Sequence, residues 1–446
     1  MALSGLEIYK LLPQTNCKDC DYPTCLAFAM KLAAKQAELK DCPHVSEESA
    51  TKLEAASSPP IRLIELTGGD GKVAVGNETV LFRHEKTFFH KPGLFLRLKD
   101  SEGPEAIAAQ VQAADAYNVD YVGIDLFLDG FAIEATSGDA AAFKAAIEVV
   151  RQNSKKPLIL LVTDDKLAKA GLEATAGTRP LLYAADSENW EIMATVAKEA
   201  NVPLAIKADS LEAITEISEN LKAAGLEDLV LDLGMRSYQD SLDAFTKVRR
   251  LAIKQNFRAL GFPLISFPGE GEDIDESLMA AQHIAKYSGF IVLDSFDPAS
   301  LYPLLVLRQN IYTDPQKPIQ VQPGIYEINN PDADSPLLVT TNFSITYFSV
   351  ANEVEGSGWK GWLLVADAEG MSVLTAWAAG KFDAERIAKD VKAFNVEDKI
   401  SHRKLILPGQ VSVLSGELEE ELPGWEIMVG PREAVDIGSY LKEIWQ

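Results

Sequence analysis

The chain has 446 residues, of which 47% are hydrophobic and 24% are charged, and its formal net charge at pH 7 is −24. This length predicts about two to four domains, and the acidity disfavours binding to nucleic acid or to an anionic membrane surface, because both need clustered Lys and Arg. The longest apolar runs are strand-sized, and residues 1–5 lack the basic and apolar parts of a signal peptide. We therefore expect a cytoplasmic protein.

The first 57 residues form the first predicted domain, and they hold every cysteine of the chain. The spacing is Cys17-x2-Cys20-x4-Cys25-x16-Cys42. Helices are predicted around the cysteines over residues 5–12, 26–39 and 46–56, followed by a Ser-Ser-Pro-Pro linker at 57–60. A unit of this size has little core of its own, so we expect a metal centre to hold it together.

Residues 58–322 form the second predicted domain, in which short apolar runs alternate with helical stretches. The predicted strands are Leu94–Leu98, Tyr121–Leu126, Leu158–Val162, Leu181–Ala184, Leu204–Lys207, Leu229–Leu233, Leu264–Phe267 and Phe290–Leu293. Near-continuous apolar strands are typical of a parallel sheet that is covered by helices. Eight such units predict a (β/α)8, or TIM, barrel. Residues 61–91 are expected to add a hairpin before it, with the turn at Gly68-Gly69-Asp70-Gly71.

A polar, Pro-rich connection leads to the third predicted domain, residues 323–446. Its predicted strands are Leu337–Thr340, Trp362–Ala366, Lys404–Leu407 and Glu426–Val429. Alternation with helices predicts a small doubly wound, Rossmann-like α/β domain, whose ligands lie at the carboxyl ends of the strands. The candidate ligand loops are residues 340–342, 368–372, 414–416 and 429–433. Ordinary strand-to-helix turns are the alternative interpretation of the same loops.

Two kinds of metal centre compete for the cysteines. Structural zinc usually takes two close pairs of ligands, and only Cys17 and Cys20 form such a pair. Three close cysteines and a distant one followed by proline are more typical of an iron–sulfur cluster, and four thiolates suit a [4Fe–4S] cubane. Zinc and unliganded thiols stay open as alternatives. His44 lies nearby in the sequence, but four cysteines already complete the ligand set.

The predicted carboxyl ends of the barrel strands offer a second candidate site. The polar residues there are Asp125, Asp164, Asp186, Lys207, Asp209, Asp232 and Asp294. Barrel enzymes place catalysis on this face, but an Asp just after a strand also caps the next helix. No GxGxxG, P-loop or HExxH motif points to a particular reaction.

The cysteine unit, the barrel and the C-terminal domain together resemble the large (gamma) subunit of the corrinoid iron–sulfur protein family of the reductive acetyl-CoA (Wood–Ljungdahl) pathway. The stretch from Asn16 to Cys25 carries the most specific part of this resemblance. The resemblance implies a corrinoid methyl carrier. In that family Co(I) of a bound cobamide accepts a methyl group from methyltetrahydrofolate through a methyltransferase and delivers it to acetyl-CoA synthase. The [4Fe–4S] cluster reductively reactivates Co(II).

The resemblance also implies cobamide contacts and partners. The implied contacts are Thr340, Thr346, Gly370, Met371, Ser372, Val373, Leu374 and Glu433. Leu374 and Thr375 would lie near the lower face of the cobamide, and His402 lacks the Asp-x-His-x-x-Gly context of a cobalt-ligating histidine. The implied partners are a small corrinoid protein subunit in a heterodimer, methyltetrahydrofolate methyltransferase and CO dehydrogenase/acetyl-CoA synthase.

Two other interpretations stay open from the residues alone. One is an iron–sulfur-dependent TIM-barrel enzyme that transfers methyl groups. The cysteine spacing differs from the Cys-x3-Cys-x2-Cys of radical enzymes that use S-adenosylmethionine, which counts against a radical reaction. The other is a zinc-stapled scaffold without catalysis. Analysis for zinc, iron and cobalt separates these readings.

Overall fold

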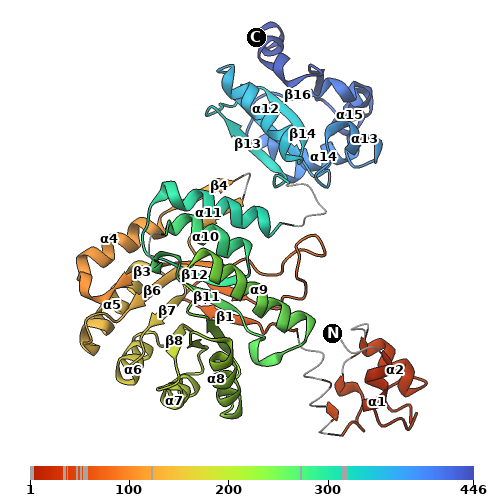
Figure 1. Cartoon of the computed structure of the whole chain (residues 1–446). Helices are drawn as coiled ribbons and strands as arrows, with labels where there is room; N and C mark the ends of the chain where they lie inside the picture. The colour runs from red at the N-terminus through yellow and green to blue at the C-terminus, as the bar shows by residue number, and fades with distance from the viewer. Residues whose placement is uncertain are drawn as a thin grey trace. The chain divides into compact units, whose positions relative to one another are not determined.

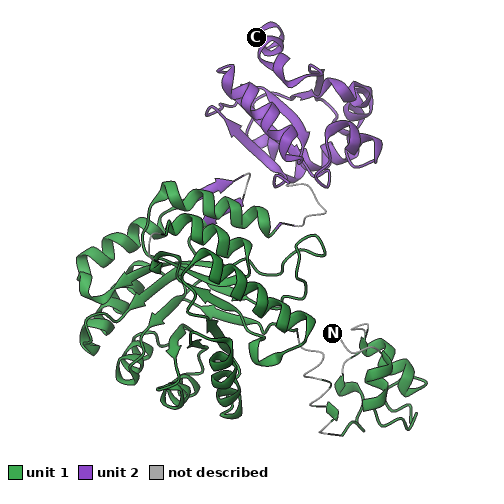
Figure 2. Ribbon diagram, in the orientation of Figure 1, with its two compact units in different colours: residues 1–118, 127–312 green, residues 119–126, 313–446 purple. Residues whose placement is uncertain are grey.

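The computed structural model of the chain describes residues 5–33, 37, 39–46, 49–50, 53, 59–121, 124–271, 274–313 and 320–445. The chain divides into two compact units, residues 1–118 with 127–312 and residues 119–126 with 313–446 (Figure 2). The finer division at residues 57 and 322 stays a prediction. Among the described helices none is long and apolar enough to cross a membrane.

Short helices build the cysteine-bearing N-terminal segment. They are α1 (Gly5–Leu11), α2 (Cys25–Ala33) and the 3-10 helix η1 (Leu39–Asp41). Helix α1 ends two residues before Pro13, since proline disfavours a helical residue before it. The small core includes Ile8, Leu12 and Phe28. The predicted helix over 46–56 and the end of the one over 26–39 fall largely outside the described residues.

Eight parallel strands close into the predicted barrel, and helices surround them (Figure 1). The strands are β3 (Gly93–Lys99), β6 (Gly130–Glu134), β7 (Leu158–Leu161), β8 (Leu181–Ala185), β9 (Leu204–Lys207), β10 (Leu229–Asp232), β11 (Leu264–Ser266) and β12 (Ser288–Leu293). The helices are α4 (Pro104–Asp115), α5 (Ala140–Asn153), α6 (Asp165–Ala174), α7 (Trp190–Ala200), α8 (Leu211–Ala223), α9 (Tyr238–Lys254), α10 (Glu276–Ala285) and α11 (Pro298–Ile311). Short 3-10 helices are η2 (Asp100–Glu102), η3 (Arg258–Leu260) and η4 (Pro268–Glu270).

The prediction that Tyr121–Leu126 is the second barrel strand is wrong. These residues lie in a separate two-stranded sheet, β4 (Asn118–Tyr121) with β5 (Ile124–Phe127), and residues 119–126 belong to the C-terminal unit. Tyr121 packs there against the core that contains Val321 and Leu338. The second barrel strand is β6, which starts at Gly130 because a Cβ there would lie 2.3 Å from the ring of Phe95.

The predicted hairpin before the barrel is confirmed. Strands β1 (Ile64–Thr67) and β2 (Lys72–Val75) pair antiparallel, with residues 68–71 between them. Their apolar side chains join the interior core of the barrel. The hairpin therefore closes the amino-terminal end of the barrel.

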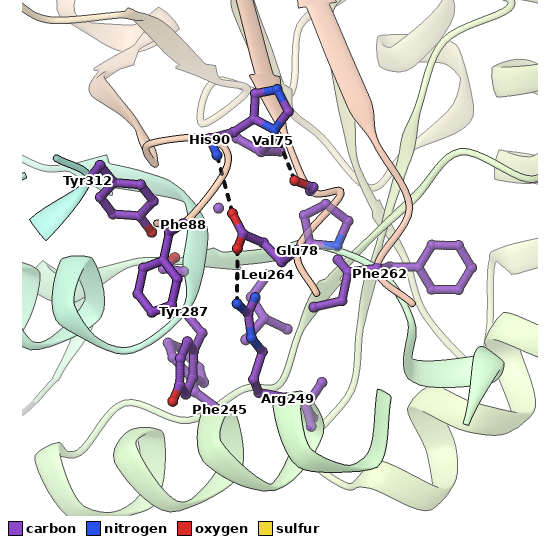
Figure 3. A pocket seen from close by; sticks show the side chains of 16 residues that line it. Val75, Glu78, Phe88, His90, Phe245, Arg249, Phe262, Leu264, Tyr287 and Tyr312 are labelled. Carbon is purple, nitrogen blue, oxygen red and sulfur yellow. Dashed lines mark hydrogen bonds and ion pairs between the residues drawn. The ribbon is translucent and has the colours of Figure 1, made fainter. Parts of the chain in front are cut away.

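A loop after this hairpin is held against the barrel by a buried ion pair (Figure 3). Glu78 lies 3.1 Å from Arg249 of α9, and their side chains are 9% and 5% exposed. The other oxygen of Glu78 accepts hydrogen bonds from the backbone N–H groups of Phe89 (2.8 Å) and His90 (3.2 Å). The Arg249 guanidinium also donates to the Val80 carbonyl and lies over the Tyr287 ring. Each charge is thus compensated, which a buried charge requires.

The C-terminal unit is a five-stranded sheet in the order β13-β15-β14-β16-β17. Its strands are β13 (Gly324–Ile328), β14 (Leu337–Thr341), β15 (Gly361–Ala366), β16 (Lys404–Leu407) and β17 (Glu426–Val429). Its helices are α12 (Ser344–Gly356), α13 (Val373–Ala378), α14 (Ala384–Ala393), α15 (Ser415–Glu421) and α16 (Ile437–Ile444). Short 3-10 helices are η5 (Val396–Asp398), η6 (Gly409–Leu414) and η7 (Ala434–Asp436).

Four strands of this sheet are parallel, and β13 is an antiparallel edge strand that the sequence did not predict. The sheet has a core on each face: Val339 points to the side of α13, α14 and α15, and Leu338 to the side of α12 and α16. The parallel strands stand in the order second, first, third, fourth, so the chain reverses its winding between β14 and β16. Doubly wound sheets bind ligands at such a switch point, outside the carboxyl ends of the strands.

His283 gives the barrel a predicted dependence of stability on pH. This α10 side chain is 1% exposed, packs on Phe245, and has no hydrogen-bond partner at either ring nitrogen within the described part of the chain. Burial, assisted by the charge of Arg236 and opposed by Asp232, lowers its pKa from 6.5 to about 4. Because the folded protein favours the neutral ring, this stabilisation is complete above pH 6.5 and is lost as the pH falls toward 4.

The native chain loses stability when the pH falls from 7.5 to 4.5. We expect this loss to be about 2 to 3 kcal/mol smaller in His283→Leu, which has no imidazole to protonate. The measurement is the free energy of unfolding in urea at both pH values, followed by far-ultraviolet circular dichroism. Carboxylates that titrate in the same range contribute equally to both proteins and cancel in the difference. The same pH dependence in both proteins would contradict the prediction.

Candidate functional site

The four cysteine side chains converge at one place in the N-terminal segment. Cys25 and Cys42 are 7% and 9% exposed and belong to the small core, Cys20 packs against it, and Cys17 is exposed. Burial raises the pKa of the Cys42 thiol, and the charges of the other three cysteines add to the rise, which requires all four to be close. Four thiols with so little core around them match the ligand set of one metal centre.

The loop that carries the first cysteines is shaped by left-handed residues and by Asn16. Asn16, Lys18 and Asp21 have positive φ angles of 51°, 72° and 63°. The Asn16 side chain accepts a hydrogen bond from the Cys25 N–H (2.8 Å), and the Asn16 N–H points at the Cys25 sulfur (3.4 Å). Hydrogen bonds to sulfur are among the interactions that set the potential of iron–sulfur clusters.

His44 lies beside this centre without adding to the sulfur ligands. Its Nε2 atom is 2.6 Å from Asp19, and this contact, with a further hydrogen bond from Cys17, lowers the pKa of the Asp19 carboxyl. Cys17, Asp19 and His44 are all exposed, and their ligand atoms lie within 4.8 Å of one another. A metal held by these three would exclude the buried Cys25 and Cys42. The cubane, which uses all four cysteines, accounts for more of the geometry.

The second candidate site lies at the carboxyl edge of the C-terminal sheet. Strand β14 pairs with β15 from Leu337 to Thr341, but its described pairing with β16 is one residue pair, Leu338 with Ile406. Thr340 and Thr341 end β14 with 0% exposure, and neither hydroxyl has a hydrogen-bond partner in the described structure. Buried polar atoms without partners are rare, so two at a switch point indicate a place for a ligand.

The contacts implied by the resemblance all lie at or after the carboxyl ends of parallel strands. Thr340 is the last residue but one of β14 and Thr346 lies in the first turn of α12, whereas residues 370–374 lead from β15 into α13. These two groups are neighbours because β14 and β15 are paired. Glu433 follows β17, two strands away from β14, or about 10 Å at the usual strand spacing. The role of these residues as corrinoid contacts stays a prediction.

Exposed apolar side chains surround the same edge. They are Ile345 and Phe348 after β14, Leu374 and Trp377 after β15, Val413 after β16, and Val429 and Val435 at and after the end of β17. We call these seven side chains the apolar rim. Exposed apolar groups gathered at one edge indicate a surface that a ligand or partner covers.

Asn342 belongs to the candidate ligand loop 340–342, but its role at this edge was not predicted from the sequence. It is 1% exposed, and its side-chain oxygen accepts hydrogen bonds from the backbone N–H groups of Ala368 and Gly370, both at 2.9 Å. The partners lie 26 and 28 residues further along the chain. Only the folded sheet brings them together, so no local sequence signal could have found the contact.

The carboxyl end of the barrel is filled by ion pairs. Arg97 lies 2.6 Å from Glu270 and 2.9 Å from Asp294, and Arg236 binds both oxygens of Asp232 at 3.0 and 2.9 Å. Burial opposes the charge of Arg97, but its acidic partners outweigh burial and raise its pKa. Both guanidinium groups are therefore already used within the protein.

Three of the other polar residues predicted for this face have structural roles or lie elsewhere, whereas Lys207 at the end of β9 and Asp209 just after it are exposed. Asp164 caps α6 by accepting from Lys166 N–H and Leu167 N–H. Asp186 accepts backbone N–H groups in the turn before α7. Asp125 lies in the hairpin of the C-terminal unit rather than at a barrel strand. Most of the polar residues predicted for this face are therefore used within the fold.

Comparison with known proteins decides between these possibilities. The family described as "Putative Fe-S cluster" matches residues 12–44, which include all four cysteines, and the family described as "CO dehydrogenase/acetyl-CoA synthase delta subunit" matches residues 64–441. A corrinoid/iron-sulfur protein large subunit from Moorella thermoacetica is 43% identical over 442 residues, which is 99% of this chain and 99% of that protein. The chain belongs to the family of corrinoid/iron-sulfur protein large subunits. The resemblance stated from the sequence is thereby confirmed.

Further relatives of this large subunit carry a different name. Acetyl-CoA decarbonylase/synthase complex subunits gamma from Methanopyrus kandleri and Archaeoglobus fulgidus are 34% and 35% identical over 99% of this chain and 98% of each relative. The similarity extends through the cysteine segment, the barrel and the C-terminal unit. The architecture of this large subunit therefore corresponds to the whole length of its relatives.

Proposed function

We propose that this chain is the corrinoid-binding subunit of a methyl carrier, with a [4Fe–4S] cluster on Cys17, Cys20, Cys25 and Cys42. The corrinoid lies at the carboxyl edge of the C-terminal, Rossmann-like sheet. The observation that carries the proposal is the pair of buried, unpartnered hydroxyls of Thr340 and Thr341 at the switch point, within the apolar rim. A large ring with apolar faces and polar side groups matches such a surface.

A bound corrinoid supplies a low-valent cobalt nucleophile that can carry a methyl group. The chain places Leu374, which is 47% exposed, at the start of α13 beside this edge. His402 is the one histidine of residues 323–446. Its Nε2 atom contacts the Ser335 carbonyl at 2.9 Å, and it precedes β16, so it lies at the opposite, amino edge of the sheet. His402 would therefore lie too far from a corrinoid at the carboxyl edge to serve as a ligand of its cobalt.

The cysteine centre supplies one-electron chemistry that a corrinoid needs when it is oxidised out of its working state. Four cysteine ligands leave no open iron position, which suits electron transfer better than substrate binding. The exposed Asp19 near Cys17 adds negative charge around the centre, which lowers its potential. A low-potential donor is the role that reductive reactivation requires.

The proposed partners are those that the resemblance implies, and the names of the relatives, which are subunits of an acetyl-CoA decarbonylase/synthase complex, support assembly into a complex. We expect a small corrinoid protein subunit as the heterodimer partner, methyltetrahydrofolate methyltransferase as the methyl donor enzyme, and CO dehydrogenase/acetyl-CoA synthase as the acceptor. The apolar rim supports the need for a covering partner, because seven exposed apolar side chains would otherwise face water.

Metal analysis of the purified complex tests the proposal. We expect about four irons and one cobalt for each copy of the chain, a corrinoid absorption spectrum, and an electron paramagnetic resonance signal of a reduced [4Fe–4S] cluster. One zinc with neither iron nor cobalt would contradict both halves of the proposal. Iron without cobalt, in protein that cannot take up added hydroxocobalamin, would contradict the methyl-carrier role alone.

A further inference from the structure

Asn342 ties together three segments at the carboxyl edge of the C-terminal sheet. It directly follows β14, at the side of the sheet where the winding reverses. Its backbone N–H donates to the Ala366 carbonyl at the end of β15, and its own carbonyl accepts from Val321 N–H, both at 2.9 Å. The residue is thus anchored in the sheet on both sides before its side chain makes any contact.

The side-chain amide of Asn342 uses its full hydrogen-bonding capacity. Its oxygen accepts from the N–H groups of Ala368 and Gly370, and its nitrogen donates to a carboxylate oxygen of Asp367 at 3.2 Å and to Gln320 at 3.5 Å. An amide oxygen has two lone pairs and an amide nitrogen two hydrogens, so every position is occupied. A buried and fully satisfied amide of this kind defines one arrangement of its partners.

The loop that Asn342 holds has an unfavourable backbone. Glu369 and Gly370 follow one another with φ angles of 54° and 74°, in the left-handed region. A side chain at Gly370 would place its Cβ 2.6 Å from Gln320. Within the loop, Met371 N–H donates to the Ala368 carbonyl (3.1 Å) and Glu369 N–H to Asp367 (3.2 Å). Asn342 supplies the contacts from outside, to the N–H groups of both Ala368 and Gly370.

We propose that Asn342 is a positioning residue that sets the conformation of residues 367–371 and through it the affinity for the corrinoid. This inference rests on the proposed function, because residues 370–374 are the expected contacts of the corrinoid. Asn342 itself is buried beneath the loop and need not touch the ligand. Asp367 is its partner, which makes the Asn342–Asp367 pair the feature to be tested.

Exchange of the amide and the carboxylate within this pair tests the proposal. Asn342→Asp keeps an oxygen for the two backbone N–H groups but sets a second carboxylate against Asp367. Asp367→Asn alone removes the charge with little change of shape. In the double variant Asn342→Asp with Asp367→Asn, position 367 carries the amide and position 342 the carboxylate. The amide nitrogen can therefore again donate to a carboxylate oxygen.

The intact protein is first freed of bound corrinoid and then titrated with hydroxocobalamin. Binding is followed by visible absorption. We expect Asn342→Asp to weaken binding roughly 30-fold or more and the double variant to recover most of that loss. Far-ultraviolet circular dichroism and iron content, which report the fold and the distant cluster, should be the same in all variants. If Asn342→Asp weakened hydroxocobalamin binding for a reason unrelated to Asp367, adding Asp367→Asn would not restore the affinity.

Three other results would overturn the inference. Native affinity in Asn342→Asp shows that the loop does not depend on this amide. A double variant as weak as Asn342→Asp shows that the pair with Asp367 is not what positions it. Failure of the native protein itself to bind hydroxocobalamin overturns the proposed function and the inference with it. If the native protein binds hydroxocobalamin and the variants bind it with the same affinity, only the inference is overturned.

Discussion

Replacement of Cys20 with alanine should abolish the iron–sulfur cluster and leave the barrel and the C-terminal unit folded. The thiol of Cys20 is one of the four proposed ligands, and the surrounding core is too small to keep the segment ordered alone, because its fully buried side chains are few. The barrel and the C-terminal sheet have separate cores of their own. We expect iron content to fall to near zero while bound cobalt stays at the native level.

The functional consequence separates the two proposed roles of the protein. Without the cluster, reductive reactivation of oxidised protein should be lost, but methyl transfer by protein reduced beforehand with a chemical reductant should continue at a rate close to the native one. Equal loss of both activities would show that the centre is structural. A protein that keeps its iron after Cys20→Ala would show that Cys20 is not a ligand.

His44→Ala is the matched control for this experiment. The imidazole lies beside the cysteines and pairs with Asp19, yet both side chains are about half exposed. If the four cysteines hold the metal, His44→Ala should keep its full iron content. If Cys17, Asp19 and His44 held it instead, loss of the imidazole would remove the metal and Cys20→Ala would not.

Arg249→Met should destabilise the barrel by about 3 to 5 kcal/mol, since the substitution leaves the carboxylate of Glu78 buried without its counter-charge. The Arg249 and Glu78 side chains are 5% and 9% exposed, and the pair anchors the loop that follows the hairpin (Figure 3). The measurement is the free energy of unfolding in urea at pH 7. A loss below about 1 kcal/mol would contradict the assignment of a buried, charged pair.

The same helix offers a control, an ion pair that is closer than the Arg249–Glu78 pair but exposed to water. Lys247 lies 2.6 Å from Asp243, which is closer than the 3.1 Å between Arg249 and Glu78, but the Lys247 and Asp243 side chains are 60% and 62% exposed. We expect Lys247→Met to leave the free energy of unfolding nearly unchanged, because water screens exposed pairs. Combining Arg249→Met with Glu78→Gln should recover part of the stability by removing the stranded charge. Equal losses for Lys247→Met and Arg249→Met would show that burial does not govern these pairs.

Strands that are buried on both faces were predictable from their composition. Runs such as Leu158–Leu161 and Leu229–Asp232 are short, apolar and followed by a helical pattern, and seven of the eight predicted barrel strands overlap strands of the barrel. The segment Tyr121–Leu126 has the same local appearance, but it runs from the end of β4 into β5, and these two strands pair with each other outside the barrel. The true second strand begins at Gly130, whose lack of a side chain makes room for Phe95.

The edge strand β13 was not predictable for a related reason. It lies in a polar, Pro-rich connection, and its residues are mostly half-buried. Its only described partner is β15, which follows it by more than thirty residues in the chain. Pairing with a strand that far away depends on the assembled sheet and leaves no periodic pattern in the segment itself.

The sequence by itself predicted an iron–sulfur centre near the N-terminus and determined the general architecture of this protein. All four cysteines lie within one short segment, so their spacing alone indicates the chemistry, and apolar periodicity is local to each strand and helix. The tertiary structure alone decided that Thr340 and Thr341 end in buried hydroxyls without partners, that the barrel mouth is filled by Arg97 and Arg236, and that Asn342 holds residues 368–370. These features join residues far apart in the chain, and such contacts arise only when the strands are packed side by side.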